Sequence, residues 1–194
     1  MFDAETMEAT RAELSLSPEE FLKRCTDQAA WVTRCMHVGD DTWTPHLTVW
    51  TKDGFEKPEQ VQMMALHVPF NNDREQFEVL QGQGARLALE TACPVCIVLI
   101  SEAWHSDDPL YGRAQGPQPK DDPRRREVVL VQGVNVLPAN YLRATAPLER
   151  LDGKLVQPLT FSEFTKPPHR LRLLDWFIGG YMQRVAKKIA ARTN

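Results

Sequence analysis

Val95-Cys96-Ile97-Val98-Leu99-Ile100 is the most apolar stretch of this chain, and the rest of the sequence is interpreted around it. The stretch is short and rich in β-branched residues, which is typical of a central strand covered on both faces. Residues 127–134 form a second apolar stretch, Glu-Val-Val-Leu-Val-Gln-Gly-Val, which we expect to be its neighbour. Together the two stretches predict the middle of a β-sheet.

Further strands are expected on both sides of this pair. Residues 46–51 alternate apolar and polar side chains and residues 61–68 are rich in apolar ones, so they predict a hairpin with a long connection. Residues 140–147 and 155–161 predict two more strands, joined near Asp152-Gly153, a dipeptide that favours hairpin turns. Pro147 and Pro158 place one or both of these strands at a sheet edge.

Three helices are expected from their caps and their periodicity. Ser17-Pro18-Glu19-Glu20 has the form of a capping box with a first-turn proline, so it starts a helix over residues 18–36. Asn71-Asn72-Asp73 caps a second helix that runs through residue 91, with an inward face made up of Phe77, Leu80, Ala85, Leu87 and Ala88. A last helix covers residues 170–191, and its apolar stripe consists of Leu171, Leu174, Ile178, Tyr181, Val185 and Ile189.

The order of these elements is α-β-β-α-β-β-β-β-α, which favours an α+β fold. We expect a mainly antiparallel sheet of about five to six strands with three helices packed on it. There is no internal repeat and no sign of a second domain, so residues 1–194 are interpreted as a single globular domain.

Composition narrows the class of protein. The 194 residues are 42% hydrophobic and 25% charged, as in an ordinary globular protein. No uncharged apolar run approaches the ~18–20 residues that span a bilayer. The first residues, Met1-Phe2-Asp3-Ala4-Glu5, are acidic where a signal peptide would be basic. We therefore expect a cytoplasmic protein that does not contact a membrane.

Charge is distributed unevenly along the chain. Residues 1–20 carry a net charge of −5, within which residues 1–16 are expected to be an acidic, flexible N-terminus, whereas residues 166–194 carry +6. The basic end either meets phosphate or supplies cations that suit a helix dipole, with the acidic terminus folding against it; we favour the second interpretation. A nucleic-acid partner is not expected because the whole chain is slightly acidic, at −3.

Four cysteines offer one close pair, Cys93-Pro94-Val95-Cys96. A redox pair belongs at a helix N-terminus, but this one leads into a buried strand. A structural zinc site usually combines two such pairs, whereas Cys25 and Cys35 are ten residues apart on one expected helix. We interpret the cysteines as reduced thiols in or near the core; a metal site and a redox role remain alternatives.

The densest group of potential catalytic side chains follows the central strand, in Glu102-Ala103-Trp104-His105-Ser106-Asp107-Asp108. Glu102 and His105 with Asp107 or Asp108 could hold a divalent cation that activates water, and the long Pro-, Asp- and Arg-rich loop over residues 106–126 would then be a lid. The alternative, which we favour, is an ordinary solvated turn with a surface histidine, because no His-Glu-x-x-His spacing is present. His46 and His67 lie on expected neighbouring strands and would strengthen the site if they converged with His105.

Arg124, Arg125 and Arg126 form a cationic cluster at the end of the same loop. Three arginines could clamp a phosphate or a carboxylate through their fork-shaped donors. They follow Asp121-Asp122-Pro123, so pairing with adjacent acids is the interpretation that we favour.

Gln81-Gly82-Gln83-Gly84-Ala85 resembles the glycine turn with which acetyltransferases of the GNAT superfamily hold the coenzyme A pyrophosphate. That turn follows a strand, whereas residues 73–80 predict a helix. The two glycines are therefore interpreted as a point of close packing between helix and sheet.

Function is the least determined property of this sequence. Our leading hypothesis is a small binding or assembly protein, non-enzymatic, with a protein partner or self-association as a homo-oligomer. It is motivated by five tryptophans, a residue enriched at interfaces. The alternative is a metal-dependent hydrolase that uses Glu102, His105, Asp107 and Asp108. No cofactor is predicted. The P-loop, Rossmann, Gly-x-Ser-x-Gly and EF-hand patterns are missing from the sequence, which removes several common folds but not enzymes in general.

Overall fold

A computed structural model describes residues 17–33, 45–51, 61–65, 73–89, 94–108, 110–111, 117–136, 140–152, 154–155, 160–167 and 171–193. The acidic segment over residues 1–16 lies outside this set. The helices are α2 (Pro18–Thr33), α3 (Asp73–Leu87), α4 (Arg172–Thr193) and a short 3-10 helix, η1 (Pro119–Asp121). The strands are β1 (His46–Thr51), β2 (Val61–Ala65), β3 (Pro94–His105), β4 (Arg126–Asn135), β5 (Asn140–Pro147), β6 (Arg150–Leu151) and β7 (Lys154–Leu155).

The five longer strands form one antiparallel sheet in the order β2-β1-β3-β4-β5. The expected α+β class and the order of elements are confirmed. So are the β1–β2 hairpin, the pairing of β3 with β4 and the edge position of β5. β6 and β7 form a separate small hairpin, whose turn residue Asp152 has a φ of 51°.

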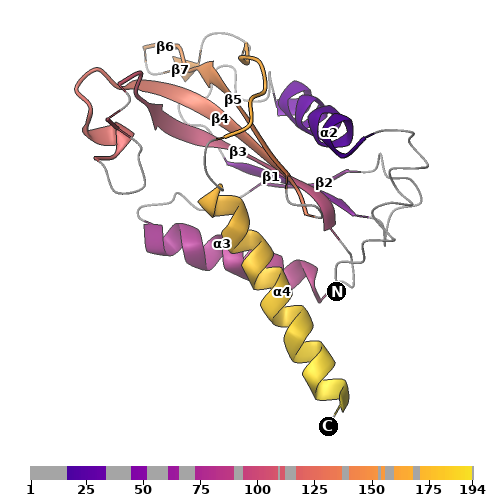
Figure 1. The fold of residues 1–194 in the computed structure, drawn as a ribbon. Coiled ribbons are helices and arrows are strands. Elements are labelled where there is room, and N and C mark those ends of the chain that lie inside the picture. Colours follow the sequence, from indigo (N-terminus) through magenta and orange to yellow (C-terminus); the bar gives the residue numbers. More distant parts are fainter. Residues whose placement is uncertain are drawn as a thin grey trace.

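Helices cover the sheet from both sides, as Figure 1 shows: α2 lies over one face, and α3 and α4 lie over the other. This arrangement explains why β3 reads as a continuous apolar run, since all its residues from Pro94 to Ser101 are buried. Beyond Ser101 the strand is no longer covered by the helices, and its side chains are alternately exposed and half-buried.

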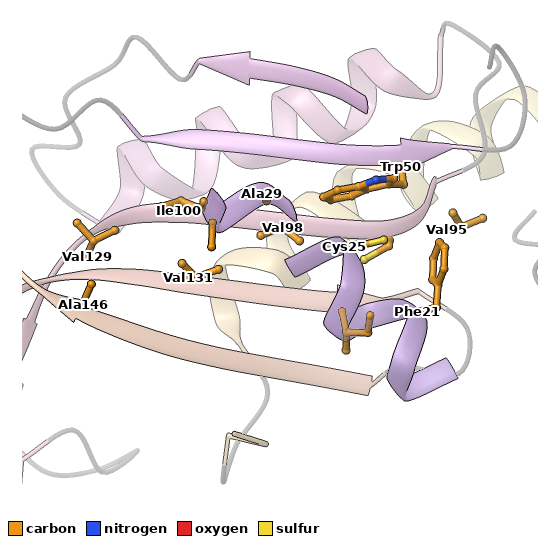
Figure 2. Packing of buried hydrophobic residues seen from close by; sticks show 13 residues of the cluster. Phe21, Cys25, Ala29, Trp50, Val95, Val98, Ile100, Val129, Val131 and Ala146 are labelled. Carbon is orange, nitrogen blue, oxygen red and sulfur yellow. The ribbon is translucent and has the colours of Figure 1, made fainter. Parts of the chain in front are cut away.

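The α2 face is built from the apolar side of that helix and from alternate positions of the strands. Phe21, Cys25 and Ala29 point from α2 onto Trp50, Val98 and Val131 (Figure 2). The helix begins as expected, because the Ser17 hydroxyl accepts the Glu20 N–H at 3.3 Å and the Glu20 carboxylate accepts the Ser17 N–H at 2.8 Å.

The other face is covered by α3 and α4, which contact each other through two glycines. A Cβ built on Gly84 would lie 2.0 Å from the Phe177 carbonyl oxygen, and one on Gly180 would lie 2.0 Å from that of Gln81. Gly84 is thus a point of close packing between two helices, and the expectation that it packs against the sheet is wrong. Gly82 and Gly84 both lie inside α3, so the segment is not a phosphate-binding turn.

Three further expectations were wrong. Phe77 is 36% exposed and makes an edge-to-face contact with Trp176, and Ile189, at the end of the α4 stripe, is 48% exposed. Residues 160–161 are not a strand. The segment around them still lies along the free edge of β5, because Arg143 and Thr165 exchange two backbone hydrogen bonds of 2.9 Å. Within the described residues, no helix is long and apolar enough to cross a membrane.

Candidate functional site

The group predicted from the sequence as a metal site is divided between the two faces of β3. Val98 and Ile100 face α2, so by strand alternation Glu102 and Trp104 lie on the same side. His105 lies on the opposite side, and Asp107 and Asp108 follow in the loop. The alternation of the strand therefore separates Glu102 from His105.

Glu102 is engaged in an ion-pair network with the small hairpin. Arg150 of β6 donates from Nη2 to the Glu102 carboxylate at 2.6 Å and from Nε to the Glu127 carboxylate at 3.2 Å. The arginine side chain is only 22% exposed. One guanidinium thus bridges two carboxylates on neighbouring strands and links the β6–β7 hairpin to the sheet.

The remaining predicted ligands join the two ends of the long loop. His105 Nε2 lies 3.1 Å from one oxygen of Asp107, and Arg126 donates to the other at 2.6 Å. Arg124 donates to Asp108 at 2.9 Å. These contacts use the carboxylates that the hydrolase hypothesis assigns to a metal.

Asp122 makes several of the contacts that hold this loop, and its carboxylate is buried. The Ser106 hydroxyl donates to one of its oxygens, and the Arg124 backbone N–H donates to the other at 2.8 Å. These two hydrogen bonds, that of Ser106 first, hold the pKa of Asp122 below its usual value. The sequence analysis had named Asp122 as a partner for the arginines and had missed its bond to Ser106.

Each arginine of the 124–126 cluster contacts a neighbour. Arg125 lies over the ring of Trp104, 4.7 Å from its centroid, and donates to the Asp122 carbonyl at 3.4 Å. Arg124 and Arg126 face Asp108 and Asp107, as described above. A hollow of about 370 Å³ lies here, lined by Asp107, Asp108, Asp122 and Arg124. Three acids against one base do not favour an anion.

His46 and His105, the two described histidines of the predicted group, do not converge. His46 is buried on β1 opposite Ile100, and His105 lies five residues farther along β3, about 17 Å away. The two also point to opposite faces, and His67 lies outside the described residues. Across the described part of the chain, no three His, Cys, Asp or Glu side chains form a group that could hold a metal ion.

The cysteines of α2 and β3 meet in the core, which the sequence did not predict. Cys25 and Cys96 are both buried, and a thiol–thiol hydrogen bond joins them. Burial first, and then this bond, raise the pKa of Cys96 well above its usual value. Cys35 and Cys93 lie outside the described residues, so the Cys93–Cys96 pair cannot be placed.

A groove beside α2 is the feature that the sequence analysis missed. We call residues 160–166 the strap; they lie along the edge of β5 and return to the start of α2 through an ion pair of Lys166 with Glu19. Between α2 and the strap is a groove of about 690 Å³, lined by Lys23, Asp27, Ala30, Trp31, Thr160, Phe161, Ser162, Glu163 and Phe164. We call it the α2 groove.

Trp31 stands at the rim of the α2 groove with 74% of its surface exposed. The signal that could have found it is the helical period, because the buried positions Phe21, Leu22, Cys25 and Ala29 form a stripe that leaves residue 31 on the outer side of the helix. Phe161 and Phe164 are half-buried and pack against the α2 face of the core. The groove thus combines an aromatic wall with an exposed indole.

Comparisons with known protein families, with curated proteins and with solved structures found no match.

Proposed function

We propose that this chain is a non-enzymatic binding protein and that its α2 groove holds an extended peptide segment of a protein partner. The observation that carries the proposal is the exposure of Trp31, 74%, at the rim of a groove whose strap side presents Phe161 and Phe164. Tryptophan is enriched among the residues that dominate binding energy, because its large ring covers much apolar surface.

The shape of the groove supports a peptide. A second hollow of about 340 Å³ shares Lys23 and Phe164 with the α2 groove and extends it to Glu19 and Lys166. From Glu19 to Trp31 the helix is about 18 Å long. An extended segment of about five or six residues has that length. A small molecule, by contrast, needs a pocket that buries most of its surface, and both rims here, Trp31 and Glu163, are exposed.

The charges along the groove indicate which peptide it would hold. Lys23 pairs with Asp27 at 3.3 Å, and Lys166 pairs with Glu19. Glu20 and Glu163 then leave the lining with a net negative charge. We therefore expect a segment with an aromatic or aliphatic residue for the space beside Trp31, followed by a lysine or arginine.

A peptide array tests this proposal. The whole protein is applied to an array of random 12-residue peptides as wild type, Trp31→Ala and Leu151→Ala. Leu151 is the matched control because it is 67% exposed and lies on β6, outside the groove. We expect the wild type and the control to retain peptides that combine an apolar residue with a base, and Trp31→Ala to lose at least ten-fold in affinity. Equal retention by Trp31→Ala, or retention of no peptide at all, would reject the proposal.

Self-association is tested on the same variants by light scattering. A wild-type dimer that becomes a monomer in Trp31→Ala would mean that the groove is occupied by a second copy of the chain and not by a partner's peptide. A thermal melt of Trp31→Ala controls for folding, and little change in stability is expected from a side chain so exposed.

The metal-dependent hydrolase is not favoured by any specific contact. Glu102 faces away from His105, and arginines already engage the three carboxylates that were its candidate ligands. A hydrolase would need these ion pairs to open before a cation could bind.

A further inference from the structure

The apolar stripe of α4 is longer than the surface it covers. Leu174 and Tyr181 are buried against the sheet and α3, Val185 is half-buried, and Ile189 is 48% exposed. Figure 1 shows the reason: the last turns of α4 extend past the sheet. The apolar stripe of α4 therefore continues to residues that are not buried by any part of the described structure.

Other apolar side chains lie at the same end of the molecule. Met182, the residue after Tyr181 on α4, is 40% exposed, and Leu89, just after α3, is 52% exposed. The Lys188 ammonium donates to the Ala88 carbonyl oxygen and so fixes this part of α4 beside the end of α3. We call Leu89, Met182, Val185 and Ile189 the terminal patch.

The terminal patch is flanked by bases. Arg184 and Lys187 are exposed, and in the described part of the chain no carboxylate pairs with either. The sole acid of α4, Asp175, lies in its first turn and accepts the Tyr141 hydroxyl at 2.7 Å. An occupant of this surface therefore needs both apolar and acidic side chains.

We propose that residues 1–16 of the same chain cover the terminal patch. This segment has four acids against one base, together with Phe2, Met7, Leu14 and Leu16. Its charge is complementary to that of α4, whereas two α4 ends brought together would place like charges opposite each other. Sixteen residues extend to about 53 Å. The starts of α2 and α4 both lie near Tyr141, which lines a hollow with Glu19 and donates to Asp175. From there the segment has to extend along α4, whose length of ~33 Å is shorter than the segment.

Zero-length carbodiimide crosslinking of the full chain tests the proposal, because it joins a carboxylate to a lysine only when the two are in contact. Protein labelled with heavy nitrogen is mixed with unlabelled protein, so that crosslinks between chains are recognised by mass. We expect crosslinks within one chain from Asp3, Glu5, Glu8 or Glu13 to Lys187 or Lys188. They should exceed those to the exposed Lys120 and Lys154 several-fold.

Two further measurements separate docking from chance encounter. Raising the salt from about 0.01 M to about 1 M shortens the Debye length from about 30 to about 3 Å and should reduce these crosslinks several-fold. Arg184→Glu should reduce them as well, since it leaves both lysines in place, while Lys154→Glu, with the same change in charge elsewhere, should not. Crosslinks between chains would identify a second copy as the occupant and overturn the proposal. Crosslinks spread evenly over the lysines, or none from residues 1–16, would also overturn it.

Discussion

Gly84 of α3 and Gly180 of α4 bring the backbones of the two helices into direct contact. Each glycine faces a carbonyl oxygen of the other helix, that of Phe177 and that of Gln81 respectively, at a distance that leaves no space for a methyl group. This crossing sets how deeply Leu80 and Phe177, both fully buried, enter the core beneath the sheet. The position of α4, and so of the terminal patch, depends on it.

Alanine at either contact glycine should therefore destabilise the protein. Gly84→Ala and Gly180→Ala each place a Cβ 2.0 Å from a backbone oxygen, and the helices must move apart to accept it. We expect a loss of about 3 kcal/mol in the free energy of unfolding, measured by urea denaturation. Gly82→Ala and Gly179→Ala are the controls, because a Cβ there meets nothing within 4 Å. Their free energy of unfolding should rise by about 0.5–1 kcal/mol, because alanine has the higher helix propensity. A similar loss at all four positions would contradict a direct backbone contact at Gly84 and Gly180.

Local signals in the sequence predicted the elements well. The capping box at Ser17 and Glu20, the alternation over β1 and the apolar run of β3 each depend on neighbours within a few residues, and each was confirmed. Gly84 shows where such reasoning stops. Its role depends on residues 177–181, and nothing near residue 84 in the sequence encodes that contact.

The candidate site was predicted less completely for the same reason. The sequence placed a polar cluster at the end of β3 and suggested that the arginines pair with acids. It could not predict that Arg150 reaches Glu102 across 48 residues, or that Ser106 meets Asp122 across 16. The α2 groove was missed altogether, because residues 160 and 161 at the start of the strap were interpreted as the end of a strand over residues 155–161, and residues 162–166 were given no role.

Arg150 is expected to stabilise the fold through the network that it forms with Glu102 and Glu127. Arg150→Ala removes the guanidinium that bridges these two carboxylates of β3 and β4, and with it the link between the β6–β7 hairpin and the sheet. We expect a loss of about 1 kcal/mol for this pair of half-exposed contacts. Arg150→Lys should lose less, because it keeps the charge but not the second donor. Arg74→Ala is the control, because Arg74 is in an ion pair in which its side chain is 86% exposed. An equal loss of stability in this control would mean that the Arg150 network contributes no more than an exposed ion pair.

Asp122 predicts a pH dependence of stability. Its pKa is lowered in the folded state, so the carboxylate stabilises the protein above its unfolded pKa of about 3.9 and loses that effect as the pH falls through the folded pKa. Asp122→Asn should therefore unfold at lower urea than the wild type at pH 7, and the difference should shrink steadily below about pH 4. Ser106→Ala should behave in the same way, since the Ser106 hydroxyl is the main cause of the shift. Asp27→Asn, at an exposed ion pair on α2, is the control; if it shows the same pH profile, Asp122 is not the responsible group.

Cys25 and Cys96 should resist thiol reagents as long as the protein is folded. Both thiols are buried between α2 and β3, and the raised pKa of Cys96 keeps it from forming the reactive thiolate at neutral pH. The measurement uses the full chain with Cys35→Ser and Cys93→Ser, so that only this pair can react with a disulfide reagent. We expect no reaction in buffer and two equivalents of thiol in urea, at a rate in dilute urea that follows global unfolding. Rapid labelling of the folded protein would mean that α2 separates from the sheet under native conditions, and the α2 groove would then be a mobile feature and not a fixed one.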